Sequence, residues 1–424
     1  MTRRTLFALL PAVCASPLPA QQDGSRDDAF SQIPFDRWLA QPDDTRIRWS
    51  SRLSDAQLSS YQRLIVSVTA EVDGAELAKR RGKGHFLLLV QVSDDKGVSW
   101  QNHLDMDLVH LEEGMKSNNV DFTLFFFILP GDYQITLAVY DDATAEHSIR
   151  KHRLHVNPLK NDPLPSAWLG LPPVEFIPVL DQPEKWYQPS LEGKLNLAAS
   201  SREPVHIDLV VNLTPSENRA GSPQAQTRIF EALLPAAKVF SQVNWGGSAF
   251  GMTLLDLSRN NVVYQQENRR PIDWSRVGAS LKDVNAGTID AHALEQRQLK
   301  ANFFVSEIRR RIRSGGSMHA GRLPVIIVLS SAYRFTETQT LQPIDVNGPT
   351  SAKLFYIRYQ PPSRLILPPP GVTRLPETPI RADYSITDQL APLLKPLDPR
   401  LFEFSTGDQF RKALAAILAE ISRL

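Results

Sequence analysis

The chain has 424 residues, of which 42% are hydrophobic and 22% are charged, and its formal net charge is +1. This length is enough for two domains with hydrophobic cores, and the composition is that of a soluble globular protein. The nearly balanced charge argues against nucleic acid or an anionic membrane surface as a partner.

The start of the chain has the three parts of an export signal. Arg3 and Arg4 form a basic beginning, Leu6 to Ala15 an apolar core, and a small-residue cleavage site ends near Ala20. The arginine pair loosely resembles a twin-arginine signal, so two export routes are open. We therefore expect a periplasmic or extracellular protein with residues 1–20 removed and residues 21–45 as a loosely ordered lead-in.

Two further features fit an exported, non-membrane protein. The only cysteine, Cys14, lies inside the predicted signal, so the mature chain would have no disulfide or thiol chemistry. The longest later apolar run, residues 124–129, is far shorter than the roughly 20 residues of a membrane-spanning helix. We expect no transmembrane segment.

Residues 46–157 alternate apolar and polar side chains with period two. The pattern is clear over residues 64–72 and again over residues 133–139, with a Pro130-Gly131-Asp132 turn before the second run. Several short strands separated by turn signals predict an antiparallel, immunoglobulin-like β-sandwich.

A proline-rich stretch follows the predicted sandwich. Eight prolines lie between residues 158 and 189, which predicts an extended linker over residues 158–190. Its tryptophans and leucines are too apolar for a free tether, so we expect it to lie along a domain surface.

From residue 191 to the end, strands and helices alternate. Residues 205–213 and 323–331 are almost continuously apolar, as central parallel strands are, and amphipathic helical patterns separate them. Thr406 and Gln409 have the spacing of a capping box before the last helix. The pattern predicts a doubly wound α/β sheet as the second domain.

Polar side chains follow the first of these apolar strands at alternating positions. Asn212, Thr214 and Ser216 offer three oxygens just past the strand. The carboxyl ends of parallel strands are where open α/β sheets usually bind ligands. We therefore take this loop as a candidate binding loop.

This arrangement resembles the von Willebrand factor type A domain over roughly residues 203–424. In that family, one loop supplies Asp-x-Ser-x-Ser, a second a Thr, and a third an Asp that together hold a metal. Here Asn212, Thr214 and Ser216 match the first loop, Thr288 the second, and Ser331 the third. Both carboxylates are replaced by neutral side chains, which implies a degenerate metal-ion-dependent adhesion site.

Without those carboxylates, nothing in the matched set neutralises a divalent cation. Mg²⁺ dehydrates reluctantly and is normally held by at least one carboxylate. We expect no cofactor, although Glu217 and Asp290 are close enough in sequence to leave a residual Mg²⁺ site open. Asp208 lies within the strand and does not restore the site.

Three functions remain. The chain is predicted to be a non-catalytic binding or scaffolding protein whose sheet edge binds a protein or glycan, with Asn212, Thr214, Ser216, Thr288 and Ser331 as binding residues. The structural alternative is that Thr214 and Ser216 only cap the following helix and stabilise the loop. Metal-dependent adhesion is the second function.

A hydrolase is the third function, and it has the weakest support. Residues 244–251 nearly match a nucleophile elbow, but Phe250 replaces the second glycine, and a strand follows instead of a helix.

Overall fold

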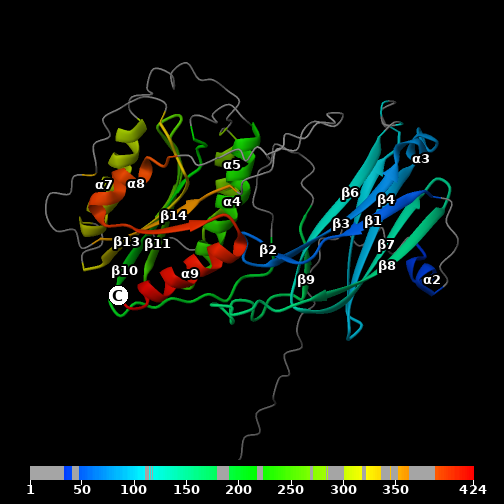
Figure 1. The fold of residues 1–424 in the computed structure, drawn as a ribbon, viewed down its shortest axis with the longest axis horizontal. Helices are drawn as coiled ribbons and strands as arrows, with labels where there is room; N and C mark the ends of the chain where they lie inside the picture. The colour runs from blue at the N-terminus through cyan, green and yellow to red at the C-terminus, as the bar shows by residue number, and fades with distance from the viewer. Residues whose placement is uncertain are drawn as a thin grey trace, which may run out of the picture.

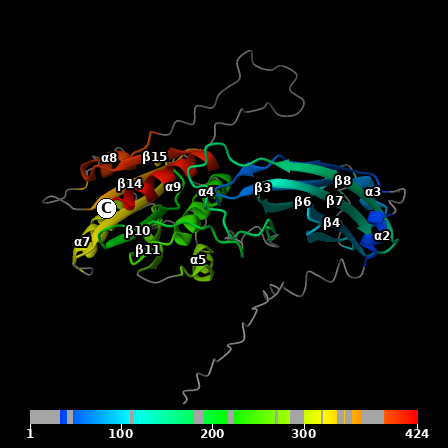
Figure 2. The same cartoon turned by 90° about the horizontal axis from the view of Figure 1, so that it is seen from below.

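The computed structural model describes residues 33–40, 47–109, 114, 116, 118–178, 191–216, 223–267, 271–282, 284, 300–317, 321–335, 344, 352–361 and 387–424. Two units lie end to end along the long axis of the molecule (Figures 1 and 2). The predicted export signal, residues 1–20, lies outside the described residues, so export stays a prediction.

The N-terminal unit consists of two antiparallel sheets that share one core. The first contains β1 (Trp49–Leu53), β3 (Leu64–Asp73), β6 (Asn119–Ile128) and β9 (Val174–Phe176), with the short β2 (Gln57–Leu58) paired to β3. The second has the order β5 (Ser99–Asp107), β4 (His85–Asp94), β7 (Gly131–Asp141) and β8 (Glu146–Val156). Alternate side chains of β3 are fully buried between the sheets, because successive strand residues point to opposite faces.

Part of the lead-in packs on the outer face of the second sheet. The helix α2 (Phe35–Ala40) buries Phe35 and Trp38 against Leu89 of β4 and Ala138 of β7. The Trp38 ring also stacks on His147, with ring centroids 3.9 Å apart. The described piece of the lead-in is therefore docked, and the loosely ordered segment expected there is wrong for these residues. A second short helix, α3 (Gly74–Ala78), follows β3.

The C-terminal unit is organised around one six-stranded mixed sheet. Its order is β12 (Asn261–Gln266), β11 (Ala249–Asp256), β10 (Val205–Asn212), β13 (Leu323–Ser331), β14 (Lys353–Tyr359) and β15 (Arg400–Phe404). The pairs of β10 with β11 and β13, of β13 with β14, and of β14 with β15 are parallel, whereas β12 runs antiparallel to β11.

Helices cover this sheet on both faces. The helices α4 (Pro223–Gln242), α5 (Trp274–Leu281) and α9 (Gly407–Ile421) pack with Ile207, Leu209 and Val211 of β10 in one core. The helices α7 (Lys300–Ser317) and α8 (Leu390–Leu394) pack with Val210 in a second core, and the 3₁₀ helix η4 (Lys395–Leu397) follows α8. Because β10 is covered on both faces, all eight of its residues are buried.

The predicted fold class, a doubly wound α/β sheet behind an immunoglobulin-like sandwich, is wrong. The described residues contain more strand than helix, and the strands form three sheets that are antiparallel or mixed. The prediction extended to the whole domain what two apolar runs indicated, residues 205–213 and 323–331, which do form parallel strands. Local periodicity identifies such strands, but it does not fix how they assemble into sheets.

A buried charge pair lies in the arginine-rich part of α7. Arg311 is 2% exposed, and its Nη1 lies 3.5 Å from Oδ1 of Asp208 on β10. Burial lowers the pKa of the Arg311 guanidinium, and Asp208 opposes this shift. Arg311 therefore does not lie on a basic surface patch, and Asp208 is engaged far from the strand's carboxyl end.

The described part of the proline-rich stretch is docked on the C-terminal unit through Arg411 of α9. Arg411 binds both carboxylate oxygens of Asp162, at 2.6 and 2.8 Å, and donates to the carbonyl of Leu164. Its guanidinium also lies over the ring of Trp168, 4.9 Å from the centroid. Burial disfavours the Asp162 carboxylate. The hydrogen bonds from Arg411, the hydrogen bond from the Leu164 backbone N–H and the Arg411 charge together outweigh burial and lower the pKa of Asp162.

A chain of hydrogen bonds continues from this linker to both units. Trp168 donates its indole N–H to the carbonyl of Gln62, and the Gln62 amide donates to the carbonyl of Gly407 at the start of α9. Gln62 is 1% exposed and has a left-handed backbone with φ of 60°. Such a conformation is costly for a residue with a side chain and persists only where its surroundings hold it.

The two units approach each other closely at Gly407. A methyl group added there would lie 2.1 Å from the carbonyl oxygen of Leu58 and 2.9 Å from that of Ser59. Both are backbone atoms of the N-terminal unit, and backbone cannot turn aside as a flexible side chain can. Only glycine allows α9 to begin this close to β2.

Among the described residues, none of the helices has the length and apolarity that crossing a membrane would require.

The Gly407 contact can be tested by Gly407→Ala. Alanine in a helix is normally favoured over glycine by roughly 0.5–1 kcal/mol, whereas overpacking against backbone costs about 1–3 kcal/mol. We expect a net loss of unfolding free energy in urea denaturation. The control is Gly247→Ala, where an added methyl group meets no atom within 4 Å. Equal stability of the two variants would contradict the tight interface.

Candidate functional site

The candidate site is the edge of the C-terminal sheet where its parallel strands end. β10 ends at Asn212, β13 at Ser331, β14 at Tyr359 and β15 at Phe404. Because these four strands run parallel, the loops that leave them meet at this edge. Four of the predicted binding residues lie at the ends of β10 and β13, and a cavity lies at the ends of β14 and β15.

Asn212 is fully buried and joins two loops. Its amide nitrogen donates to the hydroxyl of Ser330, 3.0 Å away on β13, and its amide oxygen accepts from the backbone N–H of Thr214 at 3.0 Å. Ser330, rather than the predicted Ser331, therefore faces Asn212. The hydroxyl of Ser331 is buried and has no hydrogen-bond partner among the described residues.

Thr214 ties the same loop to the end of β11. Its hydroxyl donates to Asp256 at 3.2 Å and accepts from the backbone N–H of Leu257 at 2.6 Å. Asp256 is 3% exposed and also accepts from the backbone N–H and hydroxyl of Ser258. Asp256 is thus a buried carboxylate that this network of hydrogen bonds occupies.

Ser216 connects the loop to the segment after β13. Its hydroxyl accepts from the backbone N–H of Arg334 at 3.0 Å. It also lies 3.5 Å from the Arg334 carbonyl, and Ser216 is 2% exposed. Thr288, the fifth predicted binding residue, lies outside the described residues. The structure thus brings the first and third predicted loops together, but it uses the polar groups of Asn212, Thr214 and Ser216 in internal hydrogen bonds.

Asp388 is a second buried carboxylate at this edge that sequence reasoning missed. It accepts hydrogen bonds from the backbone N–H of Tyr333 and from the hydroxyl of Tyr356, at 3.1 and 3.0 Å. Arg358 on β14 pairs with it at 3.2 Å. Burial raises the pKa of the Tyr356 phenol well above its usual value, and the Asp388 charge adds to the shift. Asp388 therefore fixes the loop after β13 onto β14.

Among the described residues, no group of three or more His, Cys, Asp or Glu side chains is placed to hold a metal ion.

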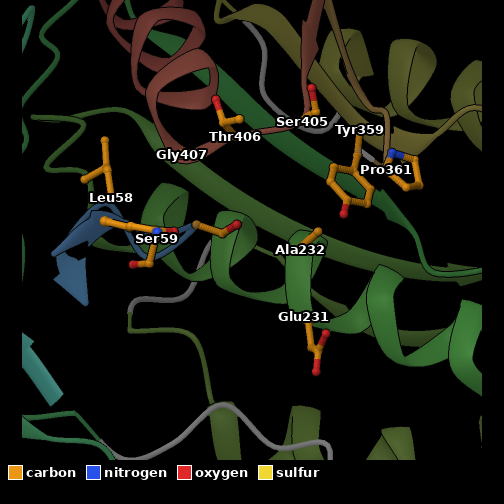
Figure 3. Close-up of a pocket in the computed structure, with 11 residues that line it drawn as sticks. Leu58, Ser59, Glu231, Ala232, Tyr359, Pro361, Ser405, Thr406 and Gly407 are labelled. Carbon is orange, nitrogen blue, oxygen red and sulfur yellow. The ribbon is translucent and has the colours of Figure 1, made fainter. Parts of the chain in front are cut away.

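The other half of the edge contains a cavity of about 370 Å³ between the two units. One wall is the β2 segment of the N-terminal unit, and the others are α4, the end of β14 and the start of α9 (Figure 3). The lining residues are Gln57, Leu58, Ser59, Ser60, Glu231, Ala232, Tyr359, Pro361, Ser405, Thr406 and Gly407. This size is typical of sites for small ligands.

The lining is rich in hydroxyl groups and poor in charge. Glu231 is the one residue of the lining with a formal charge, and its carboxylate extends from α4 away from the labelled hydroxyls (Figure 3). The hydroxyls of Ser59 and Ser405 donate to the Arg63 carbonyl and to Gln409 Oε1. The hydroxyl of Thr406 accepts from Gln409 N–H, which confirms the predicted helix cap.

The Thr406 and Gln409 cap is the one feature of this cavity that was predicted from the sequence. The wall residues come from four segments that lie far apart in the chain, residues 57–60, 231–232, 359–361 and 405–407, so no local pattern could group them.

Comparisons with known proteins add little to this geometry. No family model matches the chain. No curated protein matches it. Among solved structures, Northeast Structural Genomics Consortium target SoR45 is similar over 28% of this chain and 95% of that chain, with 14% identity and a TM-score of 0.17. A TM-score this low does not indicate a shared fold. The resemblance to the von Willebrand factor type A domain stays a prediction.

The hydroxyl of Thr214 can be tested for a structural role by Thr214→Val. This change leaves the Leu257 N–H and Asp256 each without one buried partner, which costs about 1–3 kcal/mol. We expect that loss in chemical denaturation. The control is Thr144→Val, at an exposed turn where water can take the place of the lost hydroxyl. Its free energy of unfolding should differ from that of the wild type by no more than about 0.5 kcal/mol. A Thr214→Val protein as stable as Thr144→Val would refute the buried network.

Proposed function

We propose that the chain is an exported, non-catalytic binding protein whose ligand site is the cavity at the carboxyl edge of the C-terminal sheet. One observation carries the proposal: the cavity is walled by both units and lined by hydroxyls. The sheet edge that the type A resemblance singled out is the same edge, but its ligand-accessible half is at β14 and β15.

The lining also bears on the choice between binding and catalysis. Hydrolysis by a side-chain nucleophile needs a base within hydrogen-bond reach of that nucleophile. The residues that line the cavity include serines and a threonine but no histidine, lysine, cysteine or aspartate. Glu231 points away from these hydroxyls (Figure 3). Binding is therefore the function that this lining supports better than a hydrolase.

Scaffolding fits the same geometry. A partner seated between β2 and α9 touches both units. We also propose that the chain is periplasmic or extracellular, because residues 1–20 have the pattern of an export signal.

Blocking the cavity tests the proposal. Gln57 is exposed on β2 at the cavity wall, so Gln57→Trp places a large ring at the opening with little burden on the core. We expect capture of partners from the native cell envelope by immobilised mature chain to be lost in Gln57→Trp, as followed by mass spectrometry.

The matched control is Gln134→Trp, an exposed strand position on the N-terminal unit. It should capture the same partners as the wild type. Capture that survives Gln57→Trp and Gln134→Trp equally would rule out the cavity as the site.

Metal dependence separates the proposal from metal-dependent adhesion. A ligand that does not bind cannot stabilise the folded state. The polar groups of Asn212, Thr214 and Ser216 are engaged in hydrogen bonds within the protein. We therefore expect millimolar Mg²⁺ or Mn²⁺ to leave the melting temperature of the wild type unchanged. An increase that Asn212→Ala removes would favour the adhesion alternative.

A further inference from the structure

We infer that the cavity between β2 and α9 binds an uncharged saccharide. This inference rests on the proposed function, since it names the ligand class of the same site. It follows from the charge of the cavity, from the hydrogen-bonding groups left available on its wall, and from its aromatic and aliphatic surface.

The side-chain charges of the wall disfavour the common ionic ligands. Phosphates, carboxylates and sulfates are normally bound by arginine or lysine, and no such residue lines this cavity. A cationic ligand needs carboxylates, but Glu231 is directed away from the other labelled side chains (Figure 3). A neutral ligand loses no ionic hydration in this site and so avoids the largest desolvation cost.

The available groups are both donors and acceptors. Ser59 and Ser405 use their protons inside the protein, so their oxygens can accept from a ligand. Thr406 uses its oxygen as an acceptor, so its proton can be donated. A hydroxyl both donates and accepts, and Ser60 and Gln57 can do so as well. A ligand that carries adjacent hydroxyls, each a donor and an acceptor, matches this mixture.

The non-polar part of the wall matches the other face of a sugar ring. The Tyr359 side chain descends from the end of β14 toward Ala232, beside Pro361, and Leu58 lies opposite (Figure 3). A pyranose presents C–H groups on its faces and hydroxyls on its rim, so it can contact these residues while its hydroxyls reach the serines.

The test uses the mature chain and a panel of neutral oligosaccharides built from glucose, galactose, mannose and N-acetylglucosamine. Parallel arms carry sialylated or sulfated glycans and the captured envelope proteins stripped of glycans. Affinity is measured by calorimetry for the wild type, Ser60→Ala, Gln57→Trp and the control Ser166→Ala, an exposed serine outside the cavity. Thermal melts confirm that each variant is folded.

We expect a neutral oligosaccharide to bind the wild type and Ser166→Ala equally. Ser60→Ala should weaken binding about three- to tenfold, the effect of one lost hydrogen bond, and Gln57→Trp should abolish it. Neutral sugars that fail to bind, or that bind all four proteins equally, would overturn the inference. If the deglycosylated proteins bind the wild type and Gln57→Trp abolishes that binding, the saccharide inference fails while the proposed binding function stands. If Gln57→Trp changes binding in none of the arms, both the inference and the proposed function fail.

Discussion

The close approach of Gly407 to the backbone of Leu58 sets the relation between the two units. It lets α9 begin against β2, and the cavity lies where the surfaces diverge beside this contact. The contact is held from one side by the Gln62 amide and from the other by the bidentate pair of Arg411 and Asp162. A larger residue at position 407 would move one wall of the cavity relative to the others.

The loop after β10 is rich in oxygen atoms but has no charge, and it is buried. Neutral amides and hydroxyls cost less to bury than carboxylates, provided that each is hydrogen-bonded. Asn212 and Thr214 meet this condition by binding Ser330, Asp256 and backbone N–H groups. The carboxylates at this edge, Asp256 and Asp388, are occupied in the same way. The polar atoms of the loop thus face the protein.

Sequence reasoning predicted the local features of this protein well and its assembly poorly. The apolar runs 205–213 and 323–331 are buried strands, and Thr406 caps α9, because each depends only on neighbouring residues. The fold class was wrong because the pairing of strands depends on distant partners. Arg311 with Asp208, and Arg411 with Asp162, are separated by about a hundred residues or more, so nothing local marked either arginine as buried. The cavity was unpredictable for the same reason.

A cavity whose wall is shared between two units links ligand binding to their arrangement. A ligand that contacts β2 and α9 at once binds the docked arrangement more tightly than a separated one, and by linkage it stabilises that arrangement to the same extent. The strained Gln62 backbone sits within this contact, so the docked state carries a local cost that its hydrogen bonds offset. Ligand contacts would add to the same side of that balance.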